Sequence, residues 1–183
     1  MVSNSSGIHA TPIAEHIVGF ILMFTRGFHI SIRNQSEHVW EKYQGLDEVR
    51  GKNILIVGLG EVGTETARIL HALGARVSAV SRSPKDRPAF IERLERSETL
   101  GDMLPDADFV VITLPHTKET HHLFDEKKFA LMSAQDRSAS GGKKSAAYVI
   151  NIGRGGIIKE SDLIDALKAG EKLPNEVDKT LGY

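Results

Sequence analysis

Val57-Gly58-Leu59-Gly60-Glu61-Val62-Gly63 decides the fold of this 183-residue chain. The stretch sets three glycines in the spacing G-x-G-x-x-G, directly after an apolar run and directly before an amphipathic one. A strand, a tight turn and a helix in this order are typical of a dinucleotide-binding unit. Gly58 would make the turn, Gly60 would let a diphosphate approach the backbone, and Gly63 would let helix and strand pack closely. We therefore expect the whole turn to contact a coenzyme whose diphosphate rests on the helix N-terminus, where amide groups favour negative charge.

Around this turn, short apolar runs alternate with runs of helical periodicity. We expect strands over residues 53–57, 76–80, 109–114 and 148–151. We expect helices over residues 62–73, 99–104, 125–132 and 160–169. Strands alternating with helices predict a Rossmann-type α/β fold: a doubly wound parallel sheet in a three-layer αβα arrangement. Two polar stretches, 83–98 and 133–147, carry no predicted element, and the second is expected to be a surface loop.

The chain before the sheet is expected to be helical over residues 10–44, followed by a Rossmann core over 51–183, all within a single domain of residues 1–183. Thr11 can cap the helix, with Pro12 at its first position and Glu15 in its opening turn. A second amphipathic piece, 35–43, contains Trp40. The apolar stripe of the first helix is broad enough to need a partner surface. Its residues are Ile13, Ile17, Phe20 and Phe24.

Composition excludes several classes of function. A net charge of −1 gives no basic face for nucleic acid or a membrane surface. The most apolar stretch, 13–24, is too short and too polar to cross a bilayer, and no signal peptide is evident. With no cysteine and no clustered histidines, we expect no metal site and a cytoplasmic location.

The residues after the second predicted strand indicate which coenzyme is bound. Ser81, Arg82 and Ser83 stand where an NAD-selective site usually has a carboxylate, and the next one is Asp86. A guanidinium flanked by two hydroxyls would neutralise and hydrogen-bond a 2′-phosphate. NADP is therefore favoured over NAD, which stays possible. The alternative is a solvated loop that happens to be basic.

Several separate stretches resemble the D-isomer-specific 2-hydroxyacid dehydrogenase family. Residues 7–15 (GIHATPIAE) resemble the start of the family's long helix, and the glycine turn follows at the expected distance. Residues 99–115 resemble its "sL-x-x-lL-x-x-aD…lP" stretch, with Thr117 and Thr120 matching "T-x-x-T". Residues 149–156 (VINIGRGG) resemble its "viN-x-gRG" signature, which is specific.

The resemblance implies roles for residues along the carboxyl edge of the sheet. Arg154 would be catalytic, since it would bind the carboxylate of a 2-keto or 2-hydroxy acid beside the nicotinamide, as a planar guanidinium can do bidentately. The alternative for Arg154 is a structural salt bridge. Leu114 and Pro115 would lie on the adenine side of the coenzyme. Other cofactor contacts are implied for Thr120, Asn151, Ile152, Gly153 and Arg154. A homodimer through the N-terminal helices is implied as well.

The chain departs from the family pattern at both ends. The family's substrate domain precedes the long helix, and its acid/base histidine, with a glutamate that tunes it, follows the arginine-containing strand; we expect both to be absent. His116 follows a proline but lies on the cofactor stretch, and adjacent His121 and His122 would point different ways on a regular element. We assign no acid/base. The chain is then either an incomplete piece of an NADP-dependent 2-keto acid reductase or a non-catalytic module that binds dinucleotide and dimerises.

Overall fold

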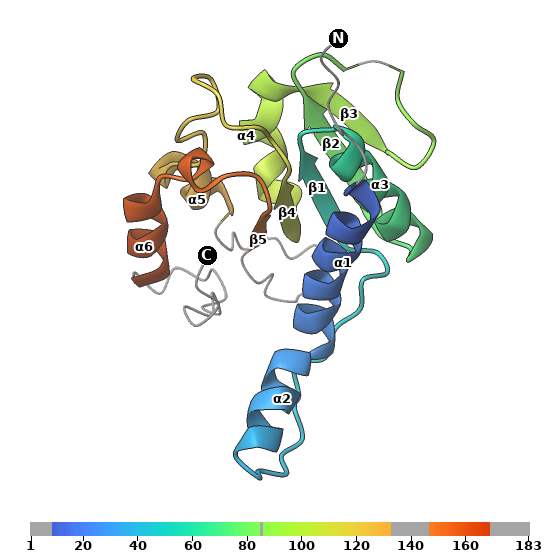
Figure 1. The fold of residues 1–183 in the computed structure, drawn as a ribbon, viewed down its shortest axis with the longest axis vertical. Helices are drawn as coiled ribbons and strands as arrows, with labels where there is room; N and C mark the ends of the chain where they lie inside the picture. The colour runs from blue at the N-terminus through green and yellow to red at the C-terminus, as the bar shows by residue number, and fades with distance from the viewer. Residues whose placement is uncertain (1–8, 85, 133–146, 169–183) are drawn as a thin grey trace.

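The computed structural model describes residues 9–84, 86–132 and 147–168, and a five-stranded parallel sheet lies at its centre. The strands are β1 (Asn53–Val57), β2 (Arg76–Ser81), β3 (Arg93–Arg96), β4 (Phe109–Ile112) and β5 (Tyr148–Asn151). Their order is β3-β2-β1-β4-β5, so the chain runs outward from β1 to β3 and then crosses back to the other side of β1 (Figure 1). The predicted doubly wound, Rossmann-type sheet is confirmed.

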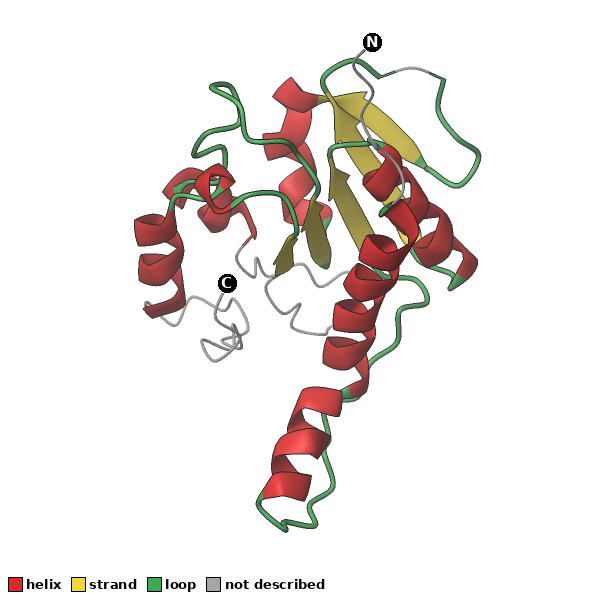
Figure 2. Cartoon of the chain, in the orientation of Figure 1, coloured by secondary structure: helices red, strands yellow, loops and turns green. Residues whose placement is uncertain are grey.

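Helices cover both faces of the sheet (Figure 2). Side chains of β1 alternate between two cores, with Ile54 and Ile56 in one and Leu55 and Val57 in the other, as the strand period of two requires. The first core is completed by α1 (Ala10–Arg26) and α3 (Glu61–Ala72). The second is completed by α4 (Leu100–Met103), α5 (Glu126–Met132) and α6 (Glu160–Lys168). The expected three-layer αβα arrangement is confirmed.

The first helix begins one residue earlier than its predicted cap. Helix α1 starts at Ala10 with no side-chain cap, so Thr11 lies inside the first turn and its assignment as the cap is wrong. The helix ends at Arg26 and is followed by Gly27, whose φ of +65° is easy for glycine. Ile17 and Ile21 are fully buried, in the core that α1 shares with α3 and the sheet. Ile13, Phe20 and Phe24 are partly buried against the same core, so the stripe packs largely within the chain, and its expected contact with a partner stays a prediction.

The predicted helical segment is also too long. Helix α2 (Phe28–Ser36) ends well before residue 44, and residues 39–48, with an exposed Trp40, have neither helix nor strand. Figure 1 shows α2 projecting away from the sheet. Among the described residues no single helix is long and apolar enough to cross a membrane, although α1 and α2 together pass that test across a 73° bend.

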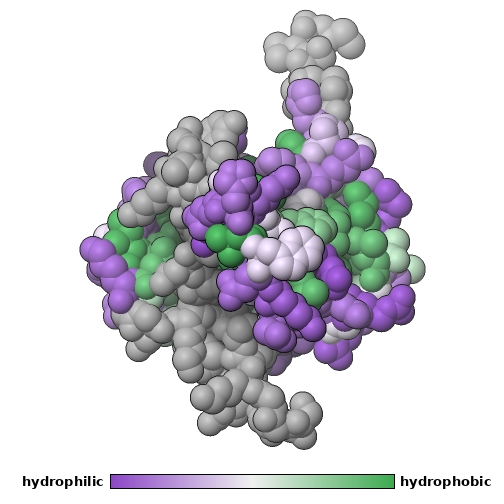
Figure 3. Space-filling view, turned by 90° about the horizontal axis from the view of Figure 1, so that it is seen from below, coloured by the Kyte–Doolittle hydropathy of each residue, from purple (hydrophilic) through white to green (hydrophobic). Residues whose placement is uncertain are grey.

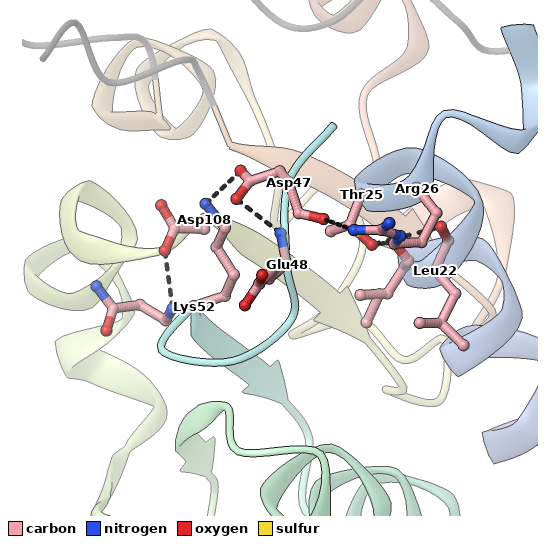
Figure 4. Close-up of polar contacts among 9 residues, drawn as sticks. Leu22, Thr25, Arg26, Asp47, Glu48, Lys52 and Asp108 are labelled. Carbon is pink, nitrogen blue, oxygen red and sulfur yellow. Dashed lines mark hydrogen bonds and ion pairs between the residues drawn. The ribbon is translucent and has the colours of Figure 1, made fainter. Parts of the chain in front are cut away.

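Polar contacts anchor the returning chain at the amino end of the sheet (Figure 4). The Asp47 amide donates to the Thr25 carbonyl over 2.7 Å, and the Arg26 guanidinium donates to the Asp47 carbonyl over 3.0 Å. Lys52 forms an ion pair with Asp47. These contacts join the end of α1 to the start of β1. They lie at the amino edge of the sheet, away from its carboxyl edge.

Strand β3 was not predicted. It lies within the stretch 83–98 and pairs with Ser78–Ser81 of β2 through its backbone. Its residues, Arg-Leu-Glu-Arg, are at most partly buried because it is an edge strand, so it lacks the apolar run that marks the other strands. The predicted loop of 133–147 lies outside the described residues except for Ala147, as does everything after Lys168.

Candidate coenzyme-binding site

The turn between β1 and α3 has the geometry that its glycines predict. Gly58 has a φ of +105°, and its amide donates to the Val80 carbonyl over 3.0 Å. A Cβ on Gly63 would lie 2.2 Å from the Gly58 carbonyl oxygen, which no side chain could tolerate. The Thr113 hydroxyl, at the end of β4, donates to that same carbonyl. The close approach of Gly58 and Gly63 thus fixes the shape of the turn, together with the hydrogen bond from Thr113 at the end of β4.

Gly60 has no such structural reason to be glycine. Its φ is −85°, which any residue adopts, and a Cβ built on it would meet nothing within 4 Å. Gly60 immediately precedes α3, where the first amides of a helix have no intrahelical acceptor. The open space beside Gly60 is therefore a cradle that a Cβ would partly fill, at a point suited to a phosphate group.

A cleft of about 500 Å³ lies along the carboxyl edge, next to this turn. It brings together eight of the predicted cofactor residues from three separate loops. These are Gly58, Leu59, Gly60, Ser81, Arg82, Leu114, Pro115 and Thr120. Leu59 and Gly60 also line a second hollow on the other side of the turn, where Glu61 lies near the start of α1. Leu59 and Gly60 thus line both hollows.

Other predicted residues lie outside the cleft. Val62 and Gly63 belong to the first turn of α3, and Ser83 follows Arg82 on the surface. Asn151 is the last residue of β5, and residues 152–154 form the separate loop that follows it. The structure thus divides the predicted set between the cleft, the start of α3 and the β5 loop.

The loop after β5 is shaped by the Asn151 side chain and lies close to the β4 loop at Gly153. The Asn151 carbonyl oxygen Oδ1 accepts from the Gly153 amide over 3.0 Å, and its Nδ2 donates to the Arg154 carbonyl over 3.2 Å. A Cβ on Gly153 would lie 2.6 Å from the Leu114 carbonyl oxygen. Asn151 and Gly153 therefore shape this loop and dock it on the β4 loop, which explains why the signature needs both residues.

Arg154 is exposed at the tip of this loop. Its Nη1 donates to the Gly153 carbonyl over 3.0 Å, and it forms no ion pair with the described residues. Within that part of the chain, the alternative of a structural salt bridge for Arg154 finds no support.

The cleft also contains residues that the sequence did not assign to the cofactor. They come from the ends of strands and from the two loops that follow β3 and β4. They are Val57, Val80, Ser97, Glu98, Leu100, Thr113, Thr117, Glu119 and Leu123. Val57 lies in the glycine stretch, Leu100 and Thr113 lie within residues 99–115, Glu119 lies inside "T-x-x-T", and Thr117 is the first residue of that motif. Its amide donates to the Thr120 hydroxyl over 2.7 Å, and that hydroxyl donates to the Pro115 carbonyl over 2.7 Å, so the pair holds the loop together.

The histidines of the same loop are arranged differently from expectation. His121 and His122 do not diverge: their rings stack, with centroids 3.8 Å apart, because His122 has a left-handed backbone with φ of +52°. His116 Nε2 lies 3.0 Å from His121 Nδ1. None of the three lines the cleft.

A parallel sheet of this order, with a glycine turn after β1 and a cleft at its carboxyl edge, defines a dinucleotide-binding α/β domain. A family model described as D-isomer specific 2-hydroxyacid dehydrogenase, NAD binding domain, matches residues 18–173. The chain belongs to this family and contains its NAD-binding domain.

Comparisons with individual proteins agree. The chain is 29% identical over 181 residues to D-lactate dehydrogenase of Staphylococcus aureus (strain MRSA252), covering 97% of this chain and 50% of that protein. Phosphoglycerate dehydrogenase from Lactobacillus plantarum is similar in structure, with a TM-score of 0.76, 31% identity, and coverage of 93% of this chain and 52% of that one. An NADPH-dependent glyoxylate/hydroxypyruvate reductase from Sinorhizobium meliloti, in complex with NADP and sulfate, has a TM-score of 0.76 at 26% identity, covering 93% and 51%. The chain spans about half the length of these relatives.

Proposed function

We propose that this chain is the coenzyme-binding part of an NADPH-preferring 2-keto acid reductase. Gly60 carries the proposal, because nothing in the fold requires glycine there and a bound diphosphate would. The turn and the first amides of α3 would hold the diphosphate, and Leu114 and Pro115 would line the adenosine side. When bound, the nicotinamide coenzyme supplies the hydride.

Arg154 is the residue proposed to bind the substrate carboxylate. Its guanidinium is exposed, without an ion pair to the described residues, on a loop docked against Leu114 of the cleft. A bidentate guanidinium–carboxylate contact would fix the keto carbon relative to the nicotinamide. We assign no described residue to the proton transfer that must accompany the hydride.

Arg82 is proposed to select NADPH. It lines the cleft beside Ser81 at the end of β2, where a 2′-phosphate would lie. Arg82→Ala should weaken NADPH binding by about ten-fold, because it removes a charge-assisted hydrogen bond, and should leave NADH binding almost unchanged. Titration calorimetry with both coenzymes measures this, with Arg76→Ala as the control: it removes the same charge at the first residue of β2, the opposite end of that strand. An unchanged NADPH-to-NADH ratio in Arg82→Ala would show that the 2′-phosphate assignment is wrong.

Turnover distinguishes the reductase from a module that only binds coenzyme. Oxidation of NADPH in the presence of glyoxylate or hydroxypyruvate would support the reductase. Coenzyme binding without turnover of any 2-keto acid would favour the binding module.

We also infer that two copies associate through α2 and the segment that follows it. Phe28 and Ile32 of α2 are 50% and 63% exposed, and Trp40 is fully exposed. Figure 3 views the molecule from this end, where hydrophobic residues lie among hydrophilic ones. A mixed surface of this kind, with an exposed tryptophan, is typical of protein–protein contacts.

A further inference from the structure

Two carboxylates share the coenzyme cleft with Arg82. Glu98 lies in the 3₁₀ turn Ser97–Thr99, which follows β3, and Glu119 lies in the loop between β4 and α5. Near Arg82 in the sequence the first carboxylate is Asp86, so the local pattern suggests a purely basic site. In the fold, by contrast, the cleft is lined by one cationic side chain, Arg82, and two anionic ones, Glu98 and Glu119.

Glu119 is held in place by the loop that carries it. The Thr117 hydroxyl donates to Glu119 Oε2 over 2.7 Å. Thr117 is itself fixed, because its amide donates to the Thr120 hydroxyl, which donates to the Pro115 carbonyl. This chain of hydrogen bonds restricts the Glu119 carboxylate to the cleft wall, whereas no hydrogen bond to the described residues holds the Glu98 side chain.

The same environment keeps Glu119 ionised. The hydrogen bond from Thr117 lowers the pKa of the Glu119 carboxyl below its usual value, with smaller contributions from the backbone and from the positive charge of Arg82. Glu119 is therefore negative at neutral pH, and its charge and that of Arg82 act on each other in the cleft.

We propose that Glu119 is a specificity-determining residue. Its carboxylate competes with a coenzyme's 2′-phosphate for interaction with Arg82 and so reduces the preference for NADPH. The inference rests on the proposed function. A 2′-phosphate carries negative charge and is repelled by Glu119, whereas the neutral 2′-hydroxyl of NADH is not and can donate to a carboxylate. Coenzyme selection would thus be shared between the end of β2 and the loop after β4.

The test is the ratio of NADPH to NADH affinity in Glu119→Gln, measured by titration calorimetry on the purified chain. Glutamine keeps an oxygen that accepts from Thr117, so the loop is retained while the charge is removed. The ratio should rise about two- to five-fold, the size expected for one exposed charge interaction, and the rise should shrink at about 1 M salt. Glu92→Gln is the matched control, since Glu92 is an exposed glutamate outside the cleft, and it should leave the ratio unchanged.

The outcomes separate this inference from the proposed function. If the unsubstituted chain binds both coenzymes and Glu119→Gln changes their affinities equally or not at all, Glu119 does not determine specificity and only this inference fails. If the unsubstituted chain binds neither coenzyme, the proposed function fails and this inference fails with it.

Discussion

Two of the three glycines of the turn are required by the fold, for different physical reasons. Gly58 needs a positive φ, and Gly63 needs the absence of a side chain because a carbonyl oxygen occupies the space. Gly60 needs neither, and we propose that a bound diphosphate is what requires glycine there. The spacing of the motif predicted the roles of Gly58 and Gly63, which the structure confirms, whereas the role of Gly60 stays a prediction.

Alanine substitutions at Gly63 and at Gly60 should change the stability of the fold by different amounts. Gly63→Ala should lower the free energy of unfolding by about 3 kcal/mol, because its Cβ would overlap the Gly58 carbonyl oxygen and force helix and strand apart. Gly60→Ala should change it by only about 0.5 kcal/mol, the effect of alanine replacing glycine just before a helix. Urea denaturation followed by circular dichroism measures both. Equal losses of stability in the two variants would contradict the packing described for Gly63.

At the scale of elements, burial decides what the sequence could predict. The bounds of β1 agree with its apolar run, since a central strand is buried on both faces. The bounds of β5 agree as well, although it is the last strand of the described sheet and only Ile150 in it is buried. Strand β3 was not predicted because its residues are mostly charged. As an edge strand it is held by backbone pairing with β2 and needs no apolar run. The helix predicted around Trp40 does not form, because a short amphipathic stretch needs a surface that buries its apolar face.

The proposed association of two copies of the chain can be tested at helix α2. If two copies meet there, the chain should sediment as a dimer at micromolar concentration, and Ile32→Asp should shift it toward the monomer by placing a charge in the interface. Folding should be unaffected, because the Ile32 side chain is mostly exposed. Glu37→Ala, just beyond the same helix, serves as a control that leaves the apolar surface intact. A monomer at all concentrations without substitution would rule out this interface.

At the scale of the molecule, the sheet brings together residues that no local pattern connects. The order β3-β2-β1-β4-β5 places the ends of β1, β2 and β4 beside one another, which is why the glycine turn, Arg82 and Leu114 share one cleft as expected. Glu98 and Glu119 join them from the loops after β3 and β4, and Glu119 lies inside the "T-x-x-T" stretch. Their place beside Arg82 in the cleft depends on long-range packing and could not be predicted from their neighbours in sequence.

The central claim is that a dinucleotide's diphosphate binds against the backbone at Gly60. Calorimetric titration of NADPH and NADH into the unsubstituted chain and into Gly60→Ala tests it most directly, because the methyl group would fill the open space without clashing with the protein. We predict measurable binding to the unsubstituted chain and at least about ten-fold weaker binding of both coenzymes to a Gly60→Ala chain that remains folded. Equal affinity in the two proteins, or no heat of binding to the folded unsubstituted chain, would contradict the claim.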